Sequence, residues 1–211
     1  MGDRRPARIE KAKRDLPVIA FKSQQAWDAW LKSQPAEAMG LWLKLAKQSS
    51  GIASVSRAEA IDTALCHGWI DGQLDSFDDT YWLIRFTPRQ PTSKWSEKNR
   101  MRALQLVELK RMQPAGLNEI ERARKDGRWS AAYAPQSTAQ VPDDLRAALA
   151  GNKKAKNFFE TLDSTNRYAI LYRIHTARKP ETRMARIEKY VTMLIEGKTI
   201  HPLKRKPREK A

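Results

Sequence analysis

The chain has 211 residues, a formal net charge of +16 and a single cysteine. That length supports one domain or two small ones, and one cysteine excludes both an internal disulfide framework and a cysteine-rich zinc site. No stretch reaches the ~18 apolar residues of a membrane span, and the first residues lack the apolar segment of a signal peptide, so we expect a cytoplasmic protein.

The positive charge is concentrated at the two ends of the sequence. Residues 1–17 carry six Lys or Arg against three acids, and residues 198–211 carry six against one. We predict both segments to be basic disordered tails that can contact nucleic acid non-specifically. The stretches 85–129 and 167–189 are also basic, and their positive field would attract anions of any kind.

The first elements predicted after the N-terminal tail are a helix, a strand and a second helix. Ser23 is placed to cap a helix whose tryptophans follow helical spacing. The short apolar run 41–45 predicts a strand. The second helix is expected to begin at Ser56, which can form a capping box with Glu59, and to end at Gly68.

A β-hairpin is predicted next. Residues 71–77 and 80–87 have strand-like composition and are joined by two aspartates. Side chains alternate between the two faces of a strand, so Phe86 and Arg85 would lie on opposite faces.

The rest of the chain is predicted to be helical. Ser93 or Ser96 is placed to cap a helix that runs to about Met112, and another helix is expected over 114–126. The segment 133–141 is rich in Pro, Ser, Thr and Gln, which is typical of a linker. Four further helices are predicted over 143–150, 153–162, 165–178 and 181–196.

Together these elements predict an α+β fold in two domains. A small mixed N-terminal α+β domain is expected over 18–133, and a C-terminal all-helical domain over 140–197. The tails 1–17 and 198–211 lie outside both domains.

The motif from Cys66 to Gly72 has a structural pattern. Neighbouring helical residues do not face each other, so Cys66 and His67 form no nucleophile–base pair, and a helix C-terminus raises the pKa of a thiol. Trp69 is expected to fold back onto the helix, and Asp71 to accept backbone N–H groups in the turn before the hairpin. No second acid is spaced to give Asp71 a catalytic partner. We assign structural roles to Cys66, Gly68, Trp69, Asp71 and Gly72, and predict no catalytic or metal-binding residue.

The segment after the hairpin is the best candidate for binding. It combines the end of a strand, a Pro-rich loop and a helix N-terminus, and its candidate residues are Arg85, Arg89, Ser93, Trp95 and Ser96. Guanidinium groups, hydroxyls and free N–H donors suit a phosphate or carboxylate, on whose carrier Trp95 could stack. Because Arg89 stands between two prolines, we expect the loop to display it. The alternative is that both arginines pair with aspartates of the hairpin and that Trp95 belongs to the core.

These stretches resemble the YdeI/OmpD-associated family, also called bacteriocin-protection proteins. The similarity rests on Gly68-Trp69-Ile70-Asp71-Gly72, the run 85–89, Trp95-Ser96, Gly127-Arg128-Trp129 and residues 181–187, and spans about 21–197. His67 departs from the family, which usually has an aromatic residue there. The resemblance implies an N-terminal α+β part, a small helical domain over about 140–197, and protection against bacteriocins or antimicrobial peptides.

The sequence therefore predicts a bacterial, cytoplasmic, non-enzymatic protein of the stress response, without a cofactor, that binds an anionic ligand or a protein partner. The alternative is a weakly sequence-specific nucleic-acid-binding protein that uses the basic stretches. Against this alternative, the chain has no helix-turn-helix, zinc-finger or RNP-like signature.

Overall fold

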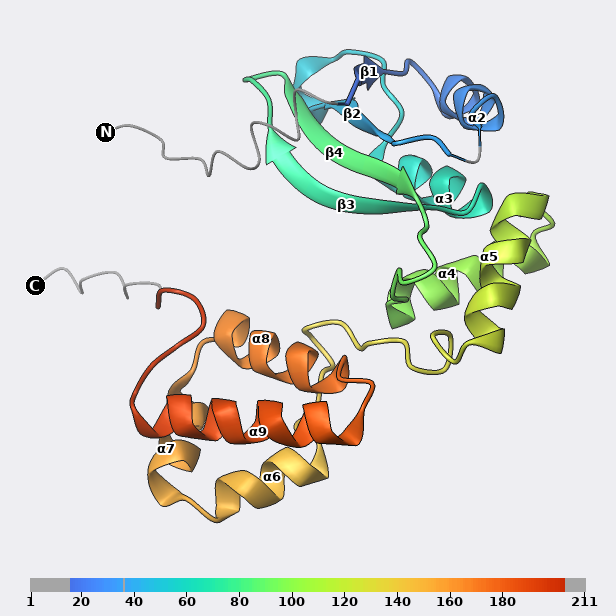
Figure 1. Cartoon of the computed structure of the whole chain (residues 1–211). Coiled ribbons are helices and arrows are strands. Elements are labelled where there is room, and N and C mark those ends of the chain that lie inside the picture. The colour runs from blue at the N-terminus through green and yellow to red at the C-terminus, as the bar shows by residue number, and fades with distance from the viewer. Residues whose placement is uncertain (1–15, 36, 204–211) are drawn as a thin grey trace, which may run out of the picture. The chain divides into compact units, whose positions relative to one another are not determined.

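The computed structural model describes residues 16–35 and 37–203, and the chain divides into two compact units, Met1–Ala132 and Tyr133–Ala211. The first unit combines a sheet with helices, and the described part of the second contains helices but no strand (Figure 1). The predicted mixed α+β composition is confirmed. The domain limits at 18, 133, 140 and 197 stay predictions.

The described residues of the first unit form a four-stranded sheet of order β1-β2-β4-β3. The strands are β1 (Val18–Ala20), β2 (Leu41–Ala46), β3 (Trp69–Ser76) and β4 (Tyr81–Pro88). β1 is parallel to β2, and the other pairs are antiparallel. The hairpin of β3 and β4 is as predicted, except that β3 begins two residues earlier than expected, at Trp69.

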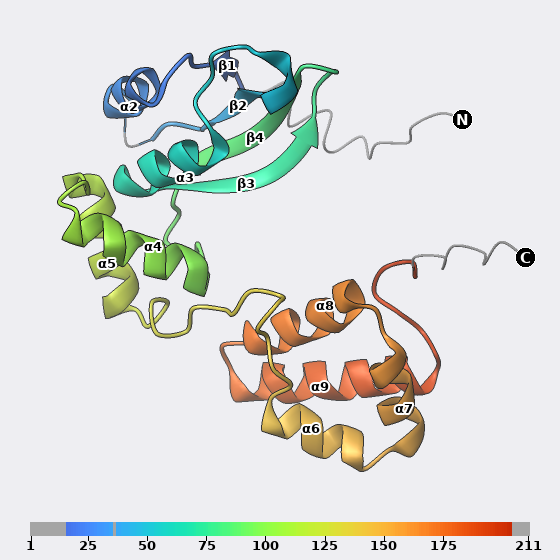
Figure 2. The ribbon, with the colours of Figure 1, turned by 180° about the vertical axis from the view of Figure 1, so that it is seen from behind.

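Helices α2 (Gln24–Lys32) and α3 (Arg57–Cys66) pack against one face of the sheet (Figures 1 and 2). Ser23 caps α2, and Ser56 forms the predicted capping box with Glu59 at the start of α3. A short 3-10 helix, η1 (Gln48–Ser50), follows β2. The core between helices and sheet includes Trp27, Leu31, Leu43, Ala60, Ala64 and Phe86.

The other face of the sheet has a small cluster of its own. Leu16, Trp42 and Leu83 are buried together there, and Arg85 is paired with Trp42 across the β2–β4 ladder. Residues paired in this way point to the same face, so the predicted separation of Arg85 from Phe86 is confirmed. Because Leu16 is buried, the tail expected over 1–17 is wrong at this residue; residues 1–15 lie outside the described part.

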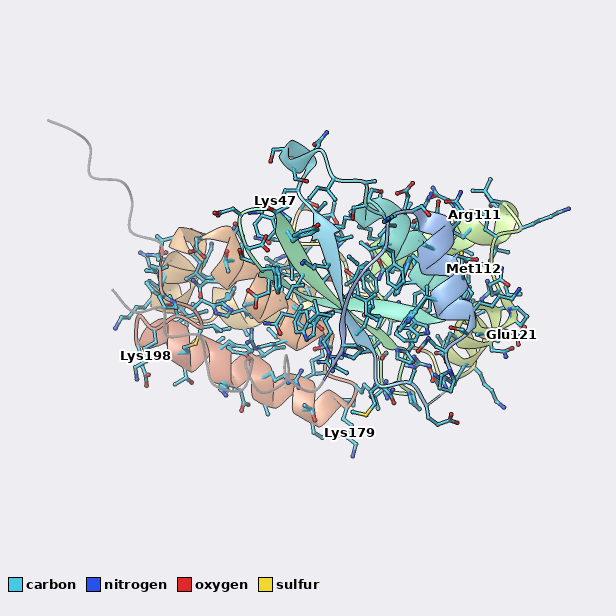
Figure 3. All side chains as sticks on the ribbon, turned by 90° about the horizontal axis from the view of Figure 1, so that it is seen from above. Lys47, Arg111, Met112, Glu121, Lys179 and Lys198 are labelled. Carbon is cyan, nitrogen blue, oxygen red and sulfur yellow. The ribbon has the colours of Figure 1, made fainter. Side chains whose placement is uncertain are left out.

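Two helices complete the first unit, α4 (Glu97–Glu108) and α5 (Pro114–Lys125). Ser96 caps α4, as one of the two predicted alternatives. α4 ends before the expected Met112, because Lys110 adopts a left-handed conformation with φ of 56°. Arg111 and Met112 follow in the turn beside α2 (Figure 3).

The described part of the second unit packs four helices: α6 (Asp143–Ala150), α7 (Lys153–Thr161), α8 (Ser164–His175) and α9 (Pro180–Ile195). Figure 3 shows Lys179 and Lys198 at the two ends of α9. His201 N–H donates to Asn166 Oδ1 over 2.8 Å, and Asn166 Nδ2 donates to the His201 carbonyl. The disorder expected over 198–211 is therefore wrong for residues near His201, while 204–211 lie outside the described residues. None of the helices described here is both long and apolar enough to cross a membrane.

Candidate functional site

Arg89 lies in the loop after β4, but its side chain is only 4% exposed. Its guanidinium carbon is 3.7 Å from the centre of the Trp95 ring, and its backbone N–H donates to the Gly68 carbonyl over 3.0 Å. The expectation that the loop displays Arg89 is wrong, because the cation–π contact holds the side chain against the protein. Its removal is therefore expected to lower stability.

The residues after Arg89 build the loop and the start of α4. Ser93 Oγ accepts the Gln90 N–H over 2.9 Å, and the Ser93 carbonyl accepts a hydrogen bond from Arg128. Ser96 Oγ accepts the Asn99 N–H over 3.1 Å. The two serine hydroxyl oxygens thus accept hydrogen bonds from the protein's own backbone, at positions where the sequence predicts a ligand.

Trp95 is 1% exposed and packs in the core, edge-to-face with Trp129, with their ring centres 4.8 Å apart. Its ring cannot stack on a bound molecule, and the part of the alternative that placed Trp95 in the core is confirmed. The pairing of both arginines with hairpin aspartates stays a prediction. Arg85, on the opposite sheet face from Phe86, does not line the cavity that Arg89 lines. The structure therefore does not bring the five predicted binding residues together at one surface.

The structural motif around Gly68 has the predicted helix end but a different turn. Gly68 has φ of 76°, a left-handed conformation that favours glycine. The Trp69 ring lies edge-on to Trp30 of α2, with the ring centres 5.7 Å apart. Asp71 lies within β3 opposite Phe86, so the expected turn at Asp71 is wrong. Gly72 occupies an irregularity in the β3–β4 register, where strands often accept glycine.

A cavity of about 560 Å³ lies where the end of α3, the Arg89 loop and the start of α5 meet. Three cations line it, namely Lys32 and Arg122, both exposed, and the buried Arg89. One carboxylate, Glu119, also lines it and forms an ion pair with Arg122. The cavity is therefore positive overall, and the candidate site lies here instead of at the start of α4.

The N-terminus of α5 opens on this cavity. Pro114 and Ala115 line it, and the N-cap residue Gln113 makes no side-chain hydrogen bond to the helix. The first N–H groups of an α-helix have no partner within the helix and carry partial positive charge. Because Pro114 has no N–H, the uncapped start of α5 offers the cavity the N–H of Ala115 in addition to the three cations.

Two glycines let α3 and α5 approach closely enough to form the cavity. A Cβ atom on Gly116 would lie 2.2 Å from the Cys66 carbonyl oxygen, and one on Gly68 would lie 3.0 Å from the Ala115 carbonyl oxygen. The Gln113 N–H donates to the Cys66 carbonyl over 3.1 Å. A glycine in the first turn of a predicted helix, as at Gly116, was the available sequence signal for this contact.

His67, at the end of α3, also lines the cavity. Its Nε2 lies 2.9 Å from Asp28 Oδ1 of α2, so the ring joins α2 to the end of α3. Cys66 beside it is buried, and burial raises the pKa of its thiol to about 11. The thiol is neutral at neutral pH and does not act as a nucleophile there. The described residues contain no group of three or more His, Cys, Asp or Glu that could hold a metal ion.

Two family models match separate parts of the chain. Residues 19–119 match a domain of unknown function, DUF8412. Residues 138–197 match the family described as Bacteriocin-protection, YdeI or OmpD-Associated. No curated protein and no solved structure shows significant similarity to the chain.

The resemblance to the YdeI/OmpD-associated family is thus confirmed for 138–197, within the helical unit. Most of the motifs that suggested it lie between Gly68 and Trp129, outside this match. The cavity beside Arg89 falls instead within the region from Leu31 to Arg122, nearly all of which matches the domain of unknown function.

Proposed function

We propose that this protein protects bacteria against bacteriocins or antimicrobial peptides, and that it does so in the cytoplasm by binding and not by catalysis. The observation that carries the proposal is the match of residues 138–197 to the bacteriocin-protection family. The single cysteine with a buried, neutral thiol fits a reducing compartment.

The binding part of the proposal concerns an anionic group held in the cavity beside Arg89. Lys32 and Arg122 are exposed at this cavity, Arg89 forms part of its wall, and the uncapped α5 N-terminus faces it. Cations and helix N-termini are the two features that most often hold phosphate or carboxylate groups. Among the described residues that line the cavity, Glu119 is the one carboxylate that opposes them, and it is paired with Arg122.

The binding part is tested by titrating the protein with inorganic phosphate in a calorimeter. The double variant Lys32→Gln, Arg122→Gln removes two cations from the rim of the cavity without touching a buried side chain. Loss of a charge-assisted hydrogen bond weakens binding by about tenfold or more, so the variant should bind phosphate at least that much more weakly. Lys125→Gln is the matched control, because Lys125 is exposed on α5 but does not line the cavity.

The protective role is tested in a bacteriocin-sensitive bacterium that expresses the chain. Expression should raise survival, the double variant should not, and Lys125→Gln should protect as the parent does. No gain in survival with the parent chain would overturn the protective role. Full protection by a double variant that no longer binds phosphate would separate the two parts and reject the cavity as the functional site.

A further inference from the structure

A second and larger hollow lies at the other end of the same sheet. It has a volume of about 750 Å³ and is lined by the end of β2, the start of α3 and the facing parts of β3 and β4. We call it the hairpin groove. It shares no lining residue with the cavity beside Arg89, so it is independent of the function proposed above.

The floor of the hairpin groove is a continuation of the hydrophobic core. Leu45 is paired with Trp82 and Leu74 with Ile84, so these side chains lie on the sheet face that α2 and α3 cover. α3 lies toward the end of the hairpin remote from its turn (Figure 1). Beyond the cover of α3, Leu74 is 48% exposed and Trp82 is 42% exposed. Large apolar side chains gathered at a hollow indicate a binding surface.

Among the residues that the structure describes, the rim of the hairpin groove carries two cations and no acid. Lys47 and Arg57 are the charged residues among its lining. Lys47 Nζ lies 5.0 Å from the centre of the Trp82 ring and donates to the Asp78 carbonyl over 2.8 Å, so the positive charge is held beside the apolar floor. Arg57 is exposed at the first position of α3.

Two acids that lie within a few residues of the groove lining in the chain, Glu59 and Asp78, are occupied elsewhere. Glu59 accepts the Ser56 N–H in the capping box, and Asp78 Oδ1 accepts the N–H groups of Thr80 and Tyr81 in the hairpin turn. Both carboxylates are therefore held by local backbone contacts, and neither lines the groove.

We propose that the hairpin groove binds an amphipathic anion, a single molecule with an aliphatic chain and one carboxylate or phosphate head. The chain would lie on Trp82 and Leu74, and the head would lie beside Lys47 and Arg57. The volume is in the range of small-molecule sites, which are mostly apolar with a few polar groups that fix orientation. The two cations disfavour an amphipathic cation, and a small anion without a chain would gain nothing from the floor.

The test uses straight-chain alkanoates below their micelle concentrations, titrated into the full-length protein by calorimetry. Burial of each added methylene should increase affinity about fourfold, so affinity should rise from hexanoate to octanoate to decanoate. Decyl phosphate should bind like decanoate. Acetate and decyltrimethylammonium should bind at least tenfold more weakly than decanoate.

Variants locate the site. Trp82→Ala should weaken decanoate binding at least tenfold, and Lys47→Gln with Arg57→Gln should weaken decanoate while leaving 1-decanol unchanged. Lys44→Gln is the matched control. Lys44 Nζ lies 4.1 Å from the centre of the Tyr81 ring, a cation–π contact like that of Lys47 with Trp82. Lys44 is paired with Leu83, however, and so lies on the opposite sheet face. The Lys44→Gln variant should bind decanoate as the parent does. Thermal melts of each variant confirm that it is folded.

Three results would overturn the proposal. One is the absence of decanoate binding by the parent. Another is binding that Leu74→Ala and Trp82→Ala, both folded, leave unchanged. The third is binding to vesicles that contain phosphatidylglycerol without binding to monomeric decanoate or decyl phosphate, which would identify a membrane surface in place of a single molecule.

Discussion

Two helices begin near the Arg89 loop, and their N-termini differ. α4 follows Ser96, whose hydroxyl accepts the Asn99 N–H, and the residue before this cap is the buried Trp95. α5 follows Gln113, which makes no side-chain cap, and it opens on a cavity with cations. A serine that marks a helix start in the sequence also satisfies the N–H groups that an anion would need. The stronger capping signal of the two therefore indicates a closed terminus, and the anion site that we propose lies at the helix with the weaker signal.

The largest expected effect breaks the contact on which the start of α5 depends. In Gly116→Ala the new Cβ atom would meet the Cys66 carbonyl oxygen at 2.2 Å and the Leu65 carbonyl oxygen at 2.8 Å. Both are backbone atoms that cannot turn away, so α5 must shift from α3. We expect a loss of stability on the order of 3 kcal/mol, the upper range for overpacking, measured by urea denaturation.

Gly151→Ala is the matched control for Gly116→Ala. Its Cβ atom would meet nothing closer than 3.5 Å, an ordinary van der Waals contact. The free energy of unfolding should change by no more than about 0.5 kcal/mol, as for most surface substitutions. Equal stability of the two variants would mean that α3 and α5 do not approach as closely as described.

Local signals in the sequence predicted most of the N-terminal fold. The capping box of Ser56 and Glu59, the helix end at Gly68 and the alternation along β4 each involve neighbours in the chain. β1 was missed, because three residues carry no period and their pairing with β2 spans more than twenty positions. The early end of α4 was missed as well, because lysine at position 110 gives no sign of a left-handed conformation.

The candidate site was predictable only in part. The sequence identifies Arg89 as a loop cation, but it does not show that the Trp95 ring lies against the guanidinium. Lys32 lies in α2 and Arg122 in α5, far apart in the chain, and only the tertiary fold brings them to one cavity. Residues that act together through tertiary contact leave no local pattern, so reasoning from neighbours placed the anion site at the start of α4, whereas the site that we propose lies at the start of α5.

A smaller effect concerns Cys66, the residue of α3 on which α5 rests. Burial raises the pKa of its thiol from an ordinary 9.0 to about 11. The folded state therefore holds this proton more tightly than the unfolded state, and its contribution is complete below pH 9 and falls as pH rises from 9 toward 11. Relative to Cys66→Ala, the free energy of unfolding of the parent should fall by about 1.4 kcal/mol per pH unit in that window. The contributions of all other titrating groups are the same in both proteins and cancel in this difference. Urea denaturation at pH 8 and pH 10 measures this difference, and an identical gap at both values would contradict the buried thiol.

The smallest effects come from changing the N-cap residue of each helix in a separate variant. These variants test the comparison of the α4 and α5 N-termini directly. Ser96→Ala removes the oxygen that accepts the Asn99 N–H and should lower the free energy of unfolding by about 1 kcal/mol, the usual value of an N-cap.

Gln113→Ser supplies a hydroxyl where the backbone already has the extended conformation of a cap, with φ of −86° and ψ of 160°. Its oxygen can accept the Gly116 N–H, so stability should rise by about 0.5 kcal/mol. The same hydroxyl competes with an anion for the N–H donors at the start of α5, whose Gln113, Pro114 and Ala115 line the cavity, so phosphate should bind more weakly to Gln113→Ser while Ser96→Ala binds it as the parent does. Stronger phosphate binding by Ser96→Ala, with Gln113→Ser unchanged, would return the anion site to α4, because removal of the Ser96 hydroxyl frees an N–H donor at that terminus alone.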